Sequence, residues 1–379
     1  MSEGPGIGEQ REMRWQVRAV VVVALIYLFL IGVSALEAGI KTMGADTQEQ
    51  LFANVSNPLA GLFVGILGTV LVQSSSASTS VIVGLVASGA LGVDDAVPMI
   101  MGANIGTTVT NTLVSLGSMR QTNEFRRAFA AATVHDFFNV LAVAILLPLE
   151  LITGWLSDIA GWISEQLVGS AGSDWKSPVK EWVKEPVGWL SDFWEWVGAG
   201  GNGLGVLLVI TGLVIVVAAL TLITTNMRTL VADRMERSLN AVLGRGGGMV
   251  AMMLGLVITV AVQSSSITTS ILVPMAGAGV ITLRNAYPVT LGANVGTTIT
   301  ALLAALAASS PEALTVALVH TVFNISGILV LYTIPRVRDI PIICAETLAR
   351  VAADHRSWAV AYVVGVFVVV PVAGLAILN

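Results

Sequence analysis

The segment QSSSASTS at residues 73–80 recurs 190 residues later as QSSSITTS at residues 263–270, and six of the eight positions are identical. A second pair of segments follows at the same offset, with GANIGTTVT at residues 102–110 and GANVGTTIT at residues 292–300 identical in seven of nine positions. A third, weaker match pairs HDFFN at residue 135 with HTVFN 185 residues later. Ordered matches of this kind indicate that the chain consists of two homologous halves.

Each QSSS segment interrupts a long apolar stretch, at residues 57–91 in the first half and at residues 249–283 in the second. The interruption leaves arms of about 15 residues, or about 22 Å of helix, which are too short to cross a hydrocarbon core of about 30 Å. Two short arms that meet at a polar tip predict a re-entrant helical hairpin in each half. Non-helical backbone at that depth is tolerated only where protein or a water-filled cavity surrounds it.

The composition is typical of an integral membrane protein. Of the 379 residues, 55% are hydrophobic and only 11% are charged, and the mean hydropathy is +0.84. A soluble globular domain carries about 25% charged residues. The net charge of −5 is small and the basic residues are dispersed, which argues against a nucleic-acid partner. The single cysteine, Cys344, excludes an intrachain disulfide and a multi-cysteine metal site.

Seven apolar segments are long enough to cross a bilayer. They cover residues 15–36, 96–116, 129–153, 204–224, 286–308, 313–334 and 358–378. Because arginine-rich segments face the cytoplasm, the N-terminus and the loops that contain Arg120, Arg228 and Arg336 are predicted to lie on that side. The tryptophan-rich segment 154–202 is then external, with short helices at the membrane surface.

The predicted topology inverts the second half relative to the first. The first repeat, residues 1–153, contributes three spans before the external segment, and an odd number of crossings reverses the copy in residues 203–379. The two hairpins then enter from opposite sides, and their tips meet near the bilayer midplane. Inverted repeats with broken helices at the midplane are typical of secondary transporters, which bind substrate and ions between the repeats. The predicted fold is therefore an all-α membrane protein of two inverted repeats, with seven spans and two re-entrant hairpins.

The polar tips carry groups that suit an anion and Na⁺. A Gln-Ser-Ser-Ser tip offers amide and hydroxyl groups that both donate and accept hydrogen bonds, and a helix N-terminus at the break adds N–H groups and a positive dipole end. Hydroxyl and carbonyl oxygens suit Na⁺. The GANxGTT segments add the amides of Asn104 and Asn294 and the hydroxyls of Thr107, Thr108, Thr297 and Thr298. Helix packing is the alternative, because Ser, Thr and Gly-x-x-x-Gly patterns also serve that purpose in membranes.

His135 and Asp136 lie near the start of a predicted span. An ionisable residue inside a membrane is a candidate for function, but the pair can equally be interfacial and solvated, and His135 and His320 can instead bond neighbouring helices. The sequence contains no Walker motif, no Ser-His-Asp arrangement and no paired-histidine metal spacing. It therefore predicts neither an ATP-driven pump nor an enzyme.

The chain resembles the type II sodium–phosphate cotransporter family, as a bacterial member. The resemblance rests on the two QSSS signatures, on FRRAFA at residues 125–130 followed by TVHD at residues 133–136, and on FNISGI at residues 323–328. It covers about residues 58–148 and 255–371. It implies Na⁺-coupled uptake of inorganic phosphate by alternating access across a bacterial inner membrane, with no cofactor besides the coupling ion. The alternatives are the same scaffold carrying another oxyanion or a small carboxylate, and a passive anion channel.

Together with these polar groups, the resemblance implies roles for individual residues. The phosphate-binding candidates are Gln73, Ser74, Ser75, Ser76, Ser265, Ser266, Asn104 and Asn294. The sodium-binding candidates are Gln263, Ser264, Thr297, Thr300, Thr107, Thr108 and Asp136, the last matching an aspartate that is associated with an additional Na⁺ in some members. The chain departs from animal members in lacking external cysteines and glycosylation sites, in carrying Leu331 where they have tryptophan, and in ending at Asn379 before a final span.

Overall fold

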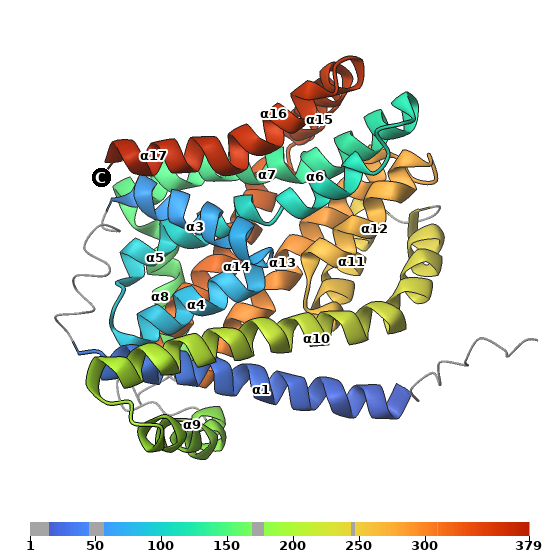
Figure 1. Ribbon diagram of the computed structural model, residues 1–379. Helices are drawn as coiled ribbons and strands as arrows, with labels where there is room; N and C mark the ends of the chain where they lie inside the picture. The colour runs from blue at the N-terminus through green and yellow to red at the C-terminus, as the bar shows by residue number, and fades with distance from the viewer. Residues whose placement is uncertain (1–14, 45–56, 169–177, 244–246, 309, 379) are drawn as a thin grey trace, which may run out of the picture.

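The computed structural model describes residues 15–44, 57–168, 178–243, 247–308 and 310–378, and every regular element in these ranges is a helix (Figure 1). Up to residue 168 the helices are α1 (Trp15–Thr42), α3 (Pro58–Val72), α4 (Ser75–Ser88), α5 (Val93–Gly106), α6 (Val109–Leu116), α7 (Thr122–Thr153) and α8 (Trp155–Val168). From residue 178 they are α9 (Pro178–Trp196), α10 (Gly201–Leu243), α11 (Gly248–Val262), α12 (Ser265–Gly277), α13 (Leu283–Ala308), α14 (Pro311–Leu331), α15 (Pro335–Asp354), α16 (Ser357–Val364), the π-helical η3 (Gly365–Val369) and α17 (Val370–Leu378).

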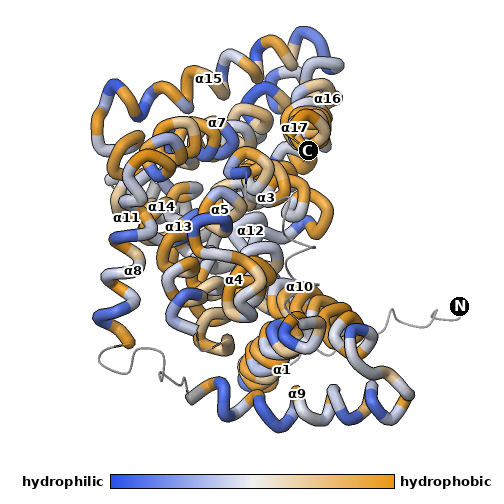
Figure 2. The backbone as a smooth tube through the Cα atoms, turned by 90° about the vertical axis from the view of Figure 1, so that its left-hand side faces the viewer, coloured by the Kyte–Doolittle hydropathy of each residue, from blue (hydrophilic) through white to orange (hydrophobic). Residues whose placement is uncertain are grey.

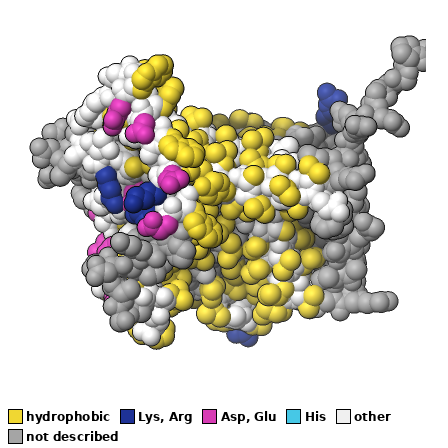
Figure 3. Space-filling model, turned by 90° about the horizontal axis from the view of Figure 1, so that it is seen from below, with side chains coloured by type: hydrophobic (Ala, Val, Ile, Leu, Met, Phe, Trp, Pro, Cys, Tyr) yellow, Lys and Arg dark blue, Asp and Glu magenta, His cyan; other side chains and the backbone are white. Residues whose placement is uncertain are grey.

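Six helical segments are long and apolar enough to cross a bilayer. They are Gln16–Thr42, Thr122–Thr153, Gly201–Met227, Leu283–Ala308, Pro311–Leu331 and Ser357–Leu378. Exposed hydrophobic side chains form a broad band around the middle of the molecule (Figure 3). The chain is therefore an all-α, multi-pass membrane protein, and six of the seven predicted spans are confirmed.

The seventh predicted span, residues 96–116, is wrong as a continuous helix. The chain forms α5 and the short α6, separated at Thr107 and Thr108. The Thr108 hydroxyl donates to the carbonyl of Ile105 at 2.8 Å, a type of bond that bends helices. Thr298 makes the equivalent bond to Val295 within the unbroken α13, so this bond alone does not explain the interruption of the helix at Thr107 and Thr108.

Two equivalent helix pairs, α3 with α5 and α11 with α13, show that the duplication extends to the packing. A Cβ atom on Gly102 would lie 2.0 Å from the carbonyl oxygen of Leu62, so only glycine fits there. A Cβ atom on Gly292 would lie 1.8 Å from the carbonyl oxygen of Met252. Both the glycines and the carbonyls are related by the 190-residue offset. Small residues let membrane helices approach closely and pack by van der Waals contact.

Helices α1 and α10 run side by side along one side of the bundle, and α9 packs against both (Figures 1 and 2). Glycines again set the close approach. A Cβ atom on Gly39 would lie 2.7 Å from the carbonyl oxygen of Gly205, and a Cβ atom on Gly212 would lie 2.6 Å from that of Gly32. This arrangement joins the first span to the first helix of the second repeat, and it places α10 across the face of the two halves.

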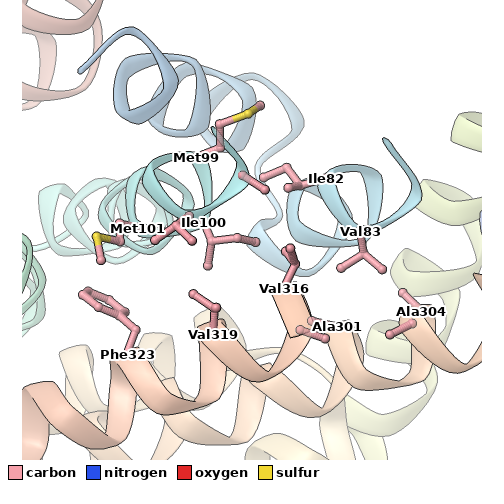
Figure 4. Close-up of a cluster of buried hydrophobic side chains, with 14 of the residues drawn as sticks. Ile82, Val83, Met99, Ile100, Met101, Ala301, Ala304, Val316, Val319 and Phe323 are labelled. Carbon is pink, nitrogen blue, oxygen red and sulfur yellow. The ribbon is translucent and has the colours of Figure 1, made fainter. Parts of the chain in front are cut away.

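The two halves meet in a hydrophobic core. Ile82 and Val83 of α4 and Ile100 of α5 lie close to Ala301 of α13 and Val316 of α14 (Figure 4). All five side chains are 4% exposed or less. Because protein interiors are close-packed, this core fixes the relative positions of α4 and α13, two of the helices that carry predicted site residues.

The arginine-containing stretch after the sixth predicted span, expected to be a loop, forms the 20-residue helix α15. The helix packs on α7 through a face of small buried residues that includes Ala345, Ala349 and Ala352. These positions are spaced by four and three residues, as one face of a helix requires. Helix α10 likewise continues to Leu243, well beyond the predicted span end at residue 224.

The tryptophan-rich segment forms two helices, α8 and α9, in its described residues, as predicted. Trp162, Trp182 and Trp189 are each more than 60% exposed, as expected of indole rings that anchor a helix at a membrane surface. Helix α8 packs on α14, and Lys180 of α9 forms a salt bridge with Glu37 of α1 at 3.3 Å. The segment is therefore tied to both halves.

Candidate functional site

Each QSSS segment produces the same break between two helices. Helix α3 ends before Gln73 and α11 ends before Gln263, and both glutamines have a backbone φ of 57°. They are the two non-glycine residues with positive φ in the described part of the chain. The left-handed conformation is unfavourable for a residue with a Cβ atom. Its presence at two equivalent positions indicates that the turn is a built feature of both repeats and not an irregularity of one half.

The residue after each glutamine starts the next helix. Ser74 and Ser264 are extended, with φ of −152° and −156°, and they cap α4 and α12. The Ser74 hydroxyl accepts a hydrogen bond from the backbone N–H of Ala77 at 3.2 Å, and the Ser264 hydroxyl accepts one from Ile267 at 3.4 Å. Serine is among the preferred residues at this position because its oxygen satisfies an otherwise unpaired N–H group.

The glutamine side chains are oriented by equivalent hydrogen bonds. The Gln73 amide donates to the carbonyl of Val70 at 2.5 Å, and the Gln263 amide donates to that of Val260 at 2.7 Å. The carboxamide oxygens each accept a hydrogen bond from a threonine hydroxyl. Thr110 lies 3.3 Å from the oxygen of Gln73, and Thr300 lies 2.9 Å from that of Gln263.

The two breaks line a single pocket of about 370 Å³. Its walls come from both breaks and from α10, which runs across them (Figure 1). The lining residues are Val72, Gln73, Ser74, Ala77, Thr110, Val217, Leu220, Thr221, Thr224, Thr225, Gln263, Ser264, Ser266 and Ile267. The helix-break segments, 190 residues apart in the sequence, are therefore brought together.

The pocket combines polar and apolar groups, and none of its lining residues carries a charge. Its polar groups are carboxamides, serine and threonine hydroxyls, and the first turns of α4 and α12. The first N–H groups of a helix have no partner within that helix, and the helix dipole makes this end positive. Two helix N-termini at one pocket therefore provide an environment that favours an anion without a fixed cationic side chain.

Of the predicted anion-binding serines, Ser74 and Ser266 line the pocket. Ser75, Ser76 and Ser265 lie in the first turns of α4 and α12, are 2% to 6% exposed, and are not among its lining residues. They stand directly behind the pocket wall.

The predicted sodium-binding residues divide into two groups. Gln263 and Ser264 line the pocket, and Thr300 reaches it through its hydrogen bond to Gln263. Thr107 and Thr297 instead donate to the carbonyls of Ala103 and Ala293 within their own helices, at 2.9 and 3.3 Å, as Thr108 does to Ile105.

Asn104 and Asn294 lie outside the pocket, in a buried network between the halves. The Asn294 amide donates to Asn139 at 2.9 Å and to Asn324 at 2.7 Å. The Asn139 amide donates to the backbone carbonyl of Asn104 at 2.8 Å, and the Asn104 side chain lies 3.2 Å from a ring nitrogen of His320. All five side chains are 2% exposed or less. The network therefore connects α5, α7, α13 and α14. Within it, His320 bonds a neighbouring helix, which is the alternative role considered for it from the sequence.

Asp136 is fully buried, which excludes the solvated alternative. One carboxylate oxygen accepts a hydrogen bond from the Tyr362 hydroxyl at 2.9 Å and another from Thr112 at 3.3 Å. Its other oxygen, Oδ1, has no hydrogen-bond partner among the described residues. A buried carboxylate oxygen without a partner is costly, and a bound cation would satisfy it.

Sequence reasoning missed two contributions to these sites. Thr221, Thr224 and Thr225 of α10 line the pocket, and their only signal in the sequence is a cluster of hydroxyls in an apolar span. Tyr362 of α16 reaches Asp136 across 226 residues of chain, and no local pattern reveals that contact.

Comparisons with known proteins match the duplicated regions. The family model described as Na⁺/Pi-cotransporter matches residues 28–153 and 215–343. Sodium-dependent phosphate transport protein 2A of Rattus norvegicus is 35% identical over 93% of this chain and 66% of its own length. Sodium-dependent phosphate transport protein 2B of Homo sapiens is 34% identical over 93% of this chain and 64% of its own length.

The chain thus spans just under two thirds of the length of these relatives. No solved structure matches it. The two matched blocks contain both QSSS segments, both GANxGTT segments and Asp136. The chain belongs to the Na⁺/Pi-cotransporter family.

Proposed function

We propose that this chain is a secondary active transporter that couples Na⁺ entry to the uptake of inorganic phosphate by alternating access. The observation that carries the proposal is the single pocket lined by both helix breaks. The relatives named as sodium-dependent phosphate transport proteins support the choice of ion and substrate. The membrane is a bacterial inner membrane, and the N-terminus lies on its cytoplasmic side.

Phosphate binds between the N-termini of α4 and α12. The hydroxyls of Ser74 and Ser266 and the backbone N–H groups of the adjacent turns hold it, with Ser75, Ser76 and Ser265 completing the shell as the helix ends adjust. The absence of an arginine from the pocket lining favours release of the anion on the other side. Asn104 and Asn294 act one layer deeper, where they keep the two halves in register.

Na⁺ binds at two places that offer oxygen ligands. One lies at the second break, where the carboxamide of Gln263 meets the hydroxyl of Thr300 and the cap of Ser264, with Thr297 one turn away. The other lies at Asp136, whose Oδ1 atom has no partner among the described residues. Thr108 and Thr107 lie at the end of α5 on the route between them.

The two breaks are the tips of re-entrant hairpins, formed by α3 with α4 and by α11 with α12. Each of these helices has 13 to 15 residues, or about 20 Å, which is short of a bilayer core. The two repeats have opposite orientations in the membrane. Their relative motion exposes the pocket to one side and then to the other, as in other transporters with inverted repeats.

The test is uptake of labelled phosphate by proteoliposomes with and without an inward Na⁺ gradient. We expect accumulation above the outside concentration only with the gradient, and competition by arsenate rather than by sulfate. Uptake that does not depend on the gradient would contradict the proposed Na⁺ coupling. Competition by sulfate would contradict the proposed choice of phosphate as the substrate. Downhill flux alone, with single-channel currents, would identify a channel.

A matched pair of threonine variants tests the site within the same assay. Thr300→Val removes the hydroxyl that donates to Gln263, whereas Thr290→Val removes an equally buried hydroxyl on the same helix that donates to the carbonyl of Ala286. We expect Thr300→Val to raise the half-saturating Na⁺ concentration about 5-fold, the equivalent of one hydrogen bond. We expect Thr290→Val to leave it unchanged. Equal effects of the two variants would reject the assignment.

A further inference from the structure

A second pocket, of about 450 Å³, lies at the C-terminal end of α12. The N-terminal end of the same helix lines the pocket between the two helix breaks, which we call the transport pocket. Residues from α7, α12, the start of α13 and α15 form its walls. They are Arg126, Arg127, Ala130, Ala276, Gly279, Ile281, Thr282, Leu283, Glu346 and Arg350. With three arginines and one glutamate, this arginine pocket has an excess of positive charge.

Arg127 is fixed at the end of α12. Its Nε atom donates to the carbonyl oxygen of Gly277 at 2.8 Å and to that of Ala276 at 3.3 Å. Gly279 turns the chain beneath the guanidinium with a φ of +79°, and a Cβ atom there would lie 3.8 Å from it. A cation in this position stabilises the negative end of a helix dipole. A terminal nitrogen of Arg127 also donates to the carbonyl oxygen of Gly277, so Arg127 forms a fixed part of the pocket wall.

Arg126 and Arg350 differ from Arg127 in their partners. They extend from α7 and α15, and neither forms a salt bridge within the described residues. Guanidinium groups match the geometry of phosphate oxygens and bind them through paired hydrogen bonds. Two such groups in the lining of one pocket favour a phosphate group, and the single Glu346 does not balance their charge.

The pocket lies at the ends of two helices that are long and apolar enough to cross a bilayer, where lipid headgroups are expected. Two membrane-crossing segments begin beside it, at Thr122 in α7 and at Leu283 in α13. Helix α15 exposes Ile340 and Ile343, which are 42% and 57% exposed, on the same helix that contributes Arg350. Apolar side chains beside a basic pocket at the end of a span can contact the acyl chains of a lipid whose headgroup occupies the pocket. A soluble anion would not contact them.

We propose that the arginine pocket binds the phosphate of an anionic phospholipid headgroup, with Arg126 and Arg350 as its ligands and Arg127 as the fixed wall. The bound lipid joins α7, α15 and the end of α12, the helix whose other end lines the transport pocket. This site is independent of phosphate transport, because it shares no lining residue with the first pocket.

The test compares two double variants of the full chain by native mass spectrometry, in nanodiscs that contain phosphatidylglycerol or phosphatidylcholine. Arg126→Gln/Arg350→Gln removes the two proposed ligands. Arg120→Gln/Arg336→Gln removes two exposed arginines that do not line the pocket and is the matched control. We expect the wild type and the control to retain phosphatidylglycerol. The pocket variant should retain at least roughly 10-fold less, because each arginine near an anionic surface contributes to the binding free energy.

A soluble probe, tripolyphosphate in neutral detergent, distinguishes the two sources of a phosphate group. One outcome is that tripolyphosphate raises the unfolding temperature of the wild type but not of the pocket variant, while neither protein prefers phosphatidylglycerol. That outcome would identify a soluble anion as the ligand and overturn the lipid assignment. Equal lipid retention by the pocket variant and the control would overturn the site itself. Equal unfolding temperatures of the two ligand-free variants show that the pocket variant is folded.

Discussion

At the first break the carboxamide of Gln73 is exposed and lies 3.3 Å from the hydroxyl of Thr110, whereas at the second break Gln263 is 8% exposed and lies 2.9 Å from Thr300. The backbones of the two breaks are nearly identical, with φ and ψ of 57° and 25° at one and 57° and 28° at the other. Local sequence therefore determines the turn, and the surroundings determine how open it is. The enclosed glutamine, Gln263, is the one proposed to bind Na⁺.

The helices that follow the breaks explain part of the difference. Thr110 lies in α6, after the interruption at Thr107 and Thr108, whereas Thr300 lies inside the unbroken α13. The second half also reaches across to the first, because Thr269 of α12 donates to the Asn111 side chain at 2.9 Å. These contacts accompany the lower exposure of Gln263 at the second break.

The largest expected effect tests the part of the comparison in which the halves are alike. Gly102→Ala and Gly292→Ala each place a Cβ atom about 2 Å from a backbone carbonyl oxygen, so a helix must move. We expect both to destabilise the protein by similar amounts, about 3 kcal/mol or more. Thermal unfolding in detergent measures this.

The control for the glycine variants is Gly68→Ala, where a Cβ atom meets nothing within 4 Å. Alanine is the better helix former, so we expect no loss of stability there. If only one of the two glycine variants lowers the unfolding temperature, the halves are not packed equivalently.

The next effect tests the part in which the halves differ. Gln263→Gly removes the carboxamide but keeps a residue that adopts positive φ without strain. It eliminates two side-chain hydrogen bonds and a proposed Na⁺ ligand. We expect Na⁺-coupled uptake to fall roughly 30-fold, the equivalent of about 2 kcal/mol. Gln73→Gly, at the exposed break, should lower it less than 5-fold.

Gln263→Ala separates the side chain from the turn. Alanine lacks the carboxamide and also strains the left-handed backbone by about 1 kcal/mol. Uptake by the alanine and glycine variants should be similarly low if the carboxamide is the essential group. Normal uptake by the glycine variant alone would show that position 263 serves only the turn.

The smallest effect sharpens the assignment of the second Na⁺ position. Tyr362→Phe removes the hydroxyl that donates to Asp136 at 2.9 Å. We expect the half-saturating Na⁺ concentration to change about 3-fold to 5-fold, with unchanged phosphate affinity at saturating Na⁺. The control is Tyr287→Phe, because the buried hydroxyl of Tyr287 has no hydrogen-bond partner within the described residues. A similar change of the half-saturating Na⁺ concentration in both variants would contradict the proposal that Asp136 binds Na⁺.

The duplicated sequence predicts the breaks well because the turn is a local property. Four polar residues in an apolar stretch end one helix before Gln73 or Gln263 and cap the next at Ser74 or Ser264. The sequence also predicts six spans, since length and hydropathy decide whether a helix crosses. It predicts neither the interruption at Thr107 nor the helix α15, which packs on α7 through a face of small residues.

The deeper part of the site was least accessible to sequence reasoning. Asn104 and Asn294 share a motif with pocket residues, yet they face a network between helices. Tyr362 completes the Asp136 site from a distant helix, and the threonines of α10 line the pocket from a helix that carries neither duplicated motif. These contacts arise from tertiary structure and leave no periodic signal.

The most direct measurement is equilibrium binding of labelled phosphate to the purified chain in saturating Na⁺, for the wild type, Ser74→Gly and Ser266→Ala, each of which removes a proposed phosphate ligand from one break. At position 74, glycine preserves most of the helix cap while it removes the hydroxyl. If both breaks form one site, the wild type binds one phosphate per chain, and each variant binds it more weakly without a change in stoichiometry. Two phosphates per chain, with one lost in each variant, would contradict a shared site.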